Sequence, residues 1–215
     1  MRPLVIAASL LVCGVSGCVS PEPPRPAPTY RPSYKPYARR EPPMSRETPA
    51  PPAAYVPPKP GPTWFPRAGR ISSRWTHIIV HHSATSTGGA AVFDKYHREQ
   101  KGWDELGYHF VIGNGSNSPD GYVEVGSRWH KQKHGAHCKT PDNYYNDHGI
   151  GICLVGNFNA TRPTARQYAS LQQLVRFLAR ECRIPPDRVT THNASARQTQ
   201  CPGRYFDLGS LRRAL

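Results

Sequence analysis

The chain has 215 residues, a formal net charge of +14, and 17 of its 24 prolines between Pro21 and Pro66. That stretch excludes a regular helix or central strand, because proline lacks the N–H that both need. The remaining residues, 71–215, are enough for one domain with its own core. The basic residues are scattered and no nucleic-acid recognition motif accompanies them, so we expect no nucleic-acid partner.

The N-terminal residues are typical of an export signal. The apolar run Leu4–Val15 is too short for a transmembrane helix, which needs about 20 residues, but it suits a secretory signal. Its end, Val15-Ser16-Gly17-Cys18, resembles the lipobox of bacterial lipoproteins. We therefore expect residues 1–17 to be a lipoprotein signal peptide and Cys18 to be lipidated. The alternative is an ordinary signal peptide with an incidental cysteine.

A lipid on Cys18 would anchor the protein to a membrane without spanning it. The next residue is Val19 and not the aspartate that retains many lipoproteins in the inner membrane. For a Gram-negative source, we expect an outer-membrane lipoprotein of the cell envelope that faces the periplasm. Residues 18–70 then form a disordered, proline-rich linker with nine basic and three acidic residues after Ser20. Its charge serves solubility or contacts an anionic surface such as phospholipid or an acidic wall polymer.

The rest of the chain alternates strand and helix patterns, which predicts an α/β fold with a mixed central sheet flanked by helices. Strands are recognised by β-branched and aromatic residues, and the longest helix by an apolar stripe with a capping Thr164. Residues 129–147 lack periodicity, as functional loops do. Expected strands cover 75–82, 108–112, 122–125, 149–155 and 189–191, the second and third forming a hairpin; expected helices cover 90–100, 164–182 and 208–215.

Three residues far apart in the sequence have the side chains of a zinc site. His81 ends an apolar strand, His192 follows another strand, and Cys201 lies in a turn. Zinc prefers imidazole and thiolate ligands, and three protein ligands leave a fourth position open for water. Such an open position suits a hydrolase. Three other cysteines, Cys138, Cys153 and Cys182, are compatible with one disulfide, and its pairing stays open.

A series of motifs recurs in the order seen in one family. Over Trp75–Asp207 the chain resembles the zinc-dependent N-acetylmuramoyl-L-alanine amidases of the type-2 amidase family, which includes a phage lysozyme and the peptidoglycan recognition proteins. Each motif alone is a weak signal, whereas their combination is specific. The motifs are Ile79–Thr85, Gly102-Trp103, Leu106–Ile112, Asp120–Glu124, Gly135-Ala136-His137, Asn146, Ile150–Ile152, and His192 with Thr199–Gly203.

The resemblance implies a peptidoglycan recognition protein-like amidase fold over residues 71–215. It also implies Zn²⁺ as cofactor, bound by His81, His192 and Cys201. The step from His192 to Cys201 is nine residues where the family has eight, which we interpret as one residue inserted into a loop.

The implied reaction is hydrolysis of the amide between N-acetylmuramic acid and L-alanine, with peptidoglycan or muropeptides as partners, for wall turnover or recycling. Tyr108 matches a catalytic tyrosine near the zinc-bound water, and Thr199 matches a position that is lysine or threonine in catalytic members. His137 matches a histidine that lines the substrate groove. By contrast, His82 and His109 are expected to be structural, because each lies on the strand face opposite its neighbour in the site.

A non-catalytic peptidoglycan-binding module is the alternative, because some relatives recognise wall fragments without cleaving them. Those members typically lack the cysteine ligand, whereas this chain has both Cys201 and Tyr108. Hydrolysis is therefore the leading hypothesis, and we expect the protein to be a monomer.

Overall fold

The computed structural model describes residues 64–67, 69–196 and 198–215. The expected signal peptide, Cys18 and most of the proline-rich linker lie outside these residues. Within them, one five-stranded sheet has the order β3-β2-β4-β1-β5. The expected mixed sheet flanked by helices is confirmed. The strands are β1 (His77–His82), β2 (Phe110–Ile112), β3 (Val123–Val125), β4 (Gly149–Leu154) and β5 (Val189–Thr191).

The sheet is parallel except at one edge. Strand β1 pairs in parallel with β4 and β5, and β2 pairs in parallel with β4. The β2–β3 pair is antiparallel, which confirms the expected hairpin. In this register Cys153 on β4 lies between His81 on β1 and Val111 on β2. The parallel strands thus bring residues from three distant parts of the chain into one row.

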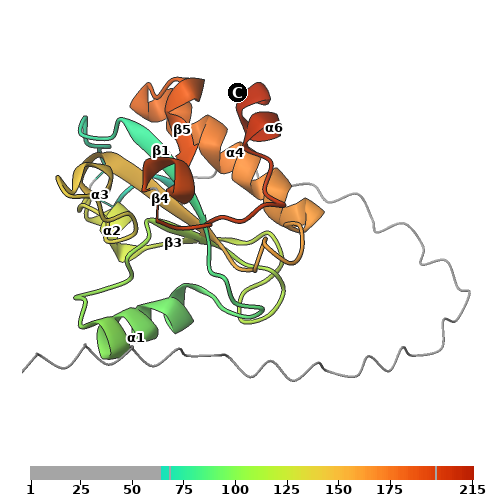
Figure 1. Cartoon of the computed structure of the whole chain (residues 1–215). Coiled ribbons are helices and arrows are strands. Elements are labelled where there is room, and N and C mark those ends of the chain that lie inside the picture. Colours follow the sequence, from blue (N-terminus) through green and yellow to red (C-terminus); the bar gives the residue numbers. More distant parts are fainter. Residues whose placement is uncertain (1–63, 68, 197) are drawn as a thin grey trace, which may run out of the picture. The chain divides into compact units, whose positions relative to one another are not determined.

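The longest helix, α4 (Ala165–Cys182), covers one face of the sheet (Figure 1). Its first turn has the expected cap: Thr164 Oγ1 accepts from Gln167 N at 3.0 Å, and Gln167 Oε1 accepts from Thr164 N at 3.2 Å. Two backbone N–H groups that the helix leaves unpaired are thereby satisfied. The apolar side of α4 packs on alternate strand residues, such as Ile78 and Val80 of β1, in the main core.

The opposite face of the sheet carries a smaller core beneath α1 (Ala90–Lys101), which ends at the expected Gly102 in the left-handed conformation. Phe93 of this helix packs with Val111, Cys153 and other side chains. The small core fills only part of this face, because Gly149 and Gly151 of β4 have no side chains there.

Two boundaries differ from the sequence-based expectation. The core begins at Trp64 and not at Ile71. The Trp64 side chain is 5% exposed and packs edge-on against Phe177. The Trp64 carbonyl accepts a hydrogen bond from Trp129 Nε1 at 2.7 Å.

The segment 129–147, expected to be irregular, contains helical turns at both ends. These turns are too short to show a helical repeat in the sequence. The short helices are α2 (Ser127–His130), α3 (Tyr144–His148), η2 (Pro186–Arg188), α5 (His192–Ser195) and α6 (Leu208–Arg213).

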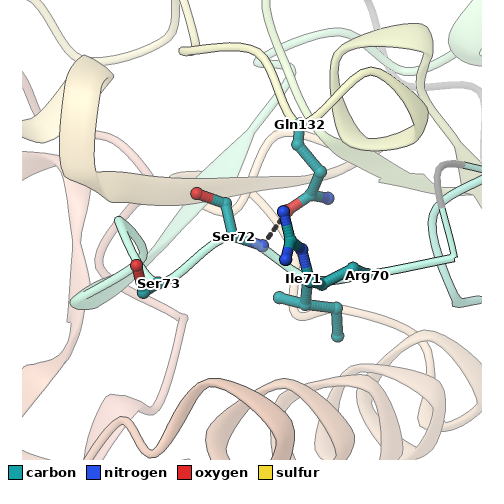
Figure 2. Close-up of a pocket in the computed structure, with 5 residues that line it drawn as sticks. All are labelled: Arg70, Ile71, Ser72, Ser73 and Gln132. Atoms are coloured by element: carbon teal, nitrogen blue, oxygen red, sulfur yellow. Dashed lines mark hydrogen bonds between the residues drawn. The ribbon is translucent and has the colours of Figure 1, made fainter.

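A polar pocket lies beside the segment that precedes β1 (Figure 2). Gln132 Oε1 accepts from Ser72 N at 2.8 Å and from Trp75 Nε1 at 2.7 Å, so this side chain ties the segment to the loop after α2. His81 is near the other end of β1, so this pocket adjoins the N-terminal segment and not the part of β1 that holds His81. Its lining residues are Arg70, Ile71, Ser72, Ser73 and Gln132.

Candidate metal centre

The three expected ligands meet on the sheet face opposite α4. His81 is on β1, His192 begins α5 directly after the neighbouring strand β5, and Cys201 lies in the turn that follows. Their ligand nitrogen and sulfur atoms all lie within 4.8 Å of one another. Strands β1 and β5 are parallel neighbours, and Val80 pairs with Thr191. The next residues, His81 and His192, therefore lie at the same end of the two strands.

The spacing of these atoms suits a tetrahedral ion. Cys201 Sγ lies 3.8 Å from His81 Nδ1. Two ligands of a tetrahedral zinc, with bonds of about 2.3 Å to sulfur and 2.0 Å to nitrogen, lie roughly 3.5 Å apart. The rings of His81 and His192 are 4.6 Å apart between centroids. Two imidazoles and one thiol in this arrangement fit Zn²⁺ by both distance and donor type.

Burial determines the protonation of the proposed ligand side chains when no metal is bound. His81 is 1% exposed, and burial lowers its pKa well below the ordinary value, so the ring is neutral and has a free lone pair. Burial also raises the pKa of Cys201 to about 12, although the hydrogen bond from His82 N to its sulfur acts in the other direction. A bound divalent cation supplies the positive charge that turns such a thiol into a thiolate.

Tyr108 lies beside the ligands just before β2. Its ring centroid is 5.3 Å from that of His81 and 5.7 Å from that of His97, which helps to hold the ring in place. Burial raises the pKa of Tyr108 well above 10, and the nearby thiols Cys153 and Cys201 act in the same direction. The hydroxyl is therefore protonated at neutral pH and can donate a hydrogen bond.

Thr199 and His137 also lie at this centre. Thr199 Oγ1 accepts from Cys201 N at 3.1 Å, so its hydroxyl stabilises the turn that presents the thiol. His137 is 7% exposed, and its Nδ1 lies 3.0 Å from His81 Nε2. Burial lowers the pKa of His137 well below the ordinary value. The catalytic role of Thr199 and the substrate contact of His137 stay predictions.

The two histidines expected to be structural are confirmed as such. His82 Nδ1 accepts from Phe158 N at 3.0 Å, on the face away from His81. His109 Nδ1 accepts from Gly151 N, and its Nε2 donates to Lys133 O, both at 3.0 Å. Both rings satisfy backbone groups of loops and strands around the site. The four cysteines among the described residues are all free, so none of them forms the disulfide that the sequence left open.

Two pockets adjoin the segment that joins His192 to Cys201, and no pattern in the sequence predicted them. One has a volume of about 500 Å³ and the other about 750 Å³. Their walls come from loops far apart in the sequence, which no local pattern links. The first is lined by Asn159, Asn193, Thr199, Gln200, Gly203 and Arg204, and the second by Lys139, Thr140, Pro141, Ser195, Ala196 and Gln198.

Arg128 is another residue that the sequence did not reveal. Its side chain is almost fully buried: Nε donates to Leu106 O and Nη1 to His134 O, each at 2.7 Å, and the guanidinium pairs with Asp104. These contacts hold the segment before Tyr108 against the loop before His137. A single buried cation thereby fixes two walls of the site relative to each other.

The fold and this cluster define an α/β protein with a set of side chains on one sheet face that could hold a metal ion. The family model described as N-acetylmuramoyl-L-alanine amidase (Amidase_2) matches residues 72–204, more than half of the chain. The chain therefore belongs to the Amidase_2 family.

Individual relatives agree with this assignment. The N-acetylmuramoyl-L-alanine amidase of Sus scrofa is 34% identical over 137 residues, covering 59% of this chain and 21% of the relative. Peptidoglycan-recognition protein SC2 of Drosophila melanogaster is 28% identical over 141 residues, covering 62% and 71%. The chain thus spans about a fifth of the length of the curated mammalian amidases that it matches first.

Solved structures show the same fold. The N-acetylmuramoyl-L-alanine amidase LysC from Clostridium intestinale URNW superposes with a TM-score of 0.56 at 29% identity, covering 66% of this chain and 87% of that one. A structure of tracheal cytotoxin bound to the ectodomain complex of peptidoglycan recognition proteins LCa and LCx has a TM-score of 0.51 at 25% identity, covering 63% and 80%. These matches confirm the expected peptidoglycan recognition protein-like amidase fold.

Proposed function

We propose that this protein is a zinc-dependent N-acetylmuramoyl-L-alanine amidase that cleaves the bond between N-acetylmuramic acid and L-alanine. The observation that carries this proposal is the convergence of the ligand atoms of His81, His192 and Cys201 within 4.8 Å. Membership of the Amidase_2 family supports it. A recognition module without catalysis would need neither a complete ligand set nor a protonated tyrosine beside it.

The three ligands would hold a zinc ion that, when bound, lowers the pKa of a coordinated water to about 7 and polarises a carbonyl. Tyr108 is protonated at neutral pH, and its hydroxyl donates a hydrogen bond to the oxygen of the scissile amide as negative charge develops there. Thr199 holds the turn of Cys201 and is a second proposed donor. The buried surroundings of His81 strengthen each of these interactions by limiting water.

Peptidoglycan or its muropeptide fragments are the proposed substrates. The two pockets along the segment from His192 to Cys201 include amide, hydroxyl and cationic groups, which suit sugar hydroxyls and the amides and carboxylates of a peptide. A related fold binds tracheal cytotoxin, according to the name of its structure. We place the cleaved amide at the ligand cluster, with the remainder of the substrate in these pockets.

The direct test is to incubate the full-length chain with defined muropeptides and to identify the products by mass spectrometry. We expect separate muramic acid and peptide products, loss of activity after treatment with a chelator, and recovery on adding zinc. Binding of the muropeptides without any cleavage by the zinc-loaded protein would favour the recognition module instead.

We also propose that residues 1–17 are removed, that Cys18 is lipidated, and that residues 18–70 tether the amidase domain to the outer membrane on its periplasmic side. The lipobox-like sequence ending at Cys18 supports this proposal. Among the residues that the structure describes, no helix has both the length and the apolar character to cross a membrane.

Replacing Cys18 with alanine should release the exported protein from membranes, because one acyl-bearing residue provides the whole anchor. Fractionation of cells that express the full-length chain measures this, and Cys13→Ala is the matched control, since Cys13 lies inside the proposed signal peptide. We expect Cys13→Ala to remain with the membrane. Unchanged membrane association of Cys18→Ala would refute lipidation at that residue.

A further inference from the structure

We propose that His137 is a positioning residue that fixes the tautomer of His81, so that Nδ1 of His81 carries the lone pair for the metal. This inference rests on the zinc site proposed above. It concerns a series of two hydrogen bonds, which links one backbone carbonyl and two imidazole rings and ends at the ligand cluster. It gives His137 a role other than direct contact with substrate.

The series of hydrogen bonds begins at the carbonyl of Gly149, at the start of β4. His137 Nε2 lies 3.2 Å from Gly149 O. A carbonyl oxygen can only accept, so the proton of this hydrogen bond belongs to His137 Nε2. A neutral imidazole carries one N–H, and its other nitrogen, here Nδ1, is then an acceptor.

The second ring follows from the first. His137 Nδ1 lies 3.0 Å from His81 Nε2, and because it accepts, His81 Nε2 must donate. The lone pair of neutral His81 is therefore on Nδ1, the nitrogen that lies 3.8 Å from Cys201 Sγ. The opposite tautomer would place a proton where the metal binds. The nitrogen that His81 offers is thus determined by a carbonyl two rings away.

The surroundings of His137 hold its ring in this place. A Cβ atom added to either Gly135 or Gly151 would lie 2.3 Å from His137 Cδ2, so both glycines leave room that the ring fills. Asn146 Oδ1 accepts from His137 N and from Cys138 N, each at 2.8 Å, and so fixes the backbone. With both ring nitrogens paired inside the protein, the ring has little freedom to turn toward a substrate.

The test is the zinc affinity of the full-length protein, measured by competition with a chromophoric chelator. His137→Phe keeps a flat ring but removes the acceptor for His81 Nε2. We expect about 10- to 100-fold weaker zinc binding, the usual effect of losing a hydrogen-bond partner of a metal ligand. Binding of cobalt(II) instead of zinc gives a second readout, because a changed ligand arrangement shifts its visible absorption.

The matched control is His109→Phe. His109 is also buried and has both ring nitrogens hydrogen-bonded, but only to backbone groups. We expect its zinc affinity to equal that of the wild type. A folded His137→Phe variant that binds zinc as tightly as the wild type would overturn the inference.

Should His137→Phe fail to fold, His137→Asn and His137→Leu replace it, because these two side chains have similar size and only asparagine has an acceptor. We expect the asparagine variant to bind zinc at least about 10-fold more tightly than the leucine variant. Equal affinities would overturn the inference. Affinity does not depend on catalysis, so wild-type protein that binds zinc but cleaves no muropeptide would contradict the proposed function alone.

Discussion

Replacing Cys201 with alanine should remove zinc from the purified protein and reduce muropeptide hydrolysis by more than about 100-fold, because even partners of a ligand contribute 10- to 100-fold to metal affinity. Cys201 is the one proposed ligand that becomes an anion, and its sulfur lies 3.8 Å from His81 Nδ1. Alanine leaves two neutral imidazoles, which hold zinc far more weakly. Metal analysis and the rate of product formation measure the two effects.

Cys138→Ala is the control for removal of a buried thiol from the same region. Cys138 is fully buried, and burial raises the pKa of its thiol to about 11, but it is outside the ligand cluster. We expect zinc content and activity to be unchanged in this variant. Activity that survives in Cys201→Ala would rule out the proposed zinc mechanism, whatever the control shows.

The second large effect is expected for Tyr108→Phe, which should lower kcat by about 10²- to 10³-fold, the usual cost of removing one donor to an oxyanion. Phenylalanine keeps the ring contacts with His81 and His97 but has no hydroxyl. Zinc content should therefore be unchanged, and KM should change little because the donor acts mainly in the transition state. Steady-state kinetics on a defined muropeptide measure both constants.

Tyr168→Phe is the matched control for this loss of a hydroxyl. Tyr168 donates to Asp207 O at 2.8 Å, between α4 and the segment before α6, and has no contact with the ligands. We expect the control to retain the wild-type kcat. An unchanged kcat in Tyr108→Phe would show that its hydroxyl is not a catalytic donor, and would leave Thr199 or water as the source of that hydrogen bond.

Much of the fold was predictable because the residues of its long helices and strands follow regular patterns of apolar side chains. The helix after Thr164 shows an apolar stripe and a capping box, and the strand Gly149–Leu154 is continuously apolar. The short helices α2, α3 and α5 were missed, since one turn of helix carries no periodic signal. Trp64 was assigned to the linker because prolines surround it, although the structure places its side chain in the core.

The candidate site was likewise predictable only in part from the sequence. By itself, the sequence determined which side chains could bind zinc, since His81, His192 and Cys201 are donors of the right chemical type, and the order of motifs around them indicated the family. Only the tertiary structure decided that these donors converge, because parallel pairing of β1 with β5 joins segments more than a hundred residues apart. It also decided the position of His137, whose hydrogen bonds to His81 and Gly149 depend on distance and ring orientation. Residue type carries the chemistry of a ligand, whereas the direction of its lone pair is set by neighbours that only folding supplies.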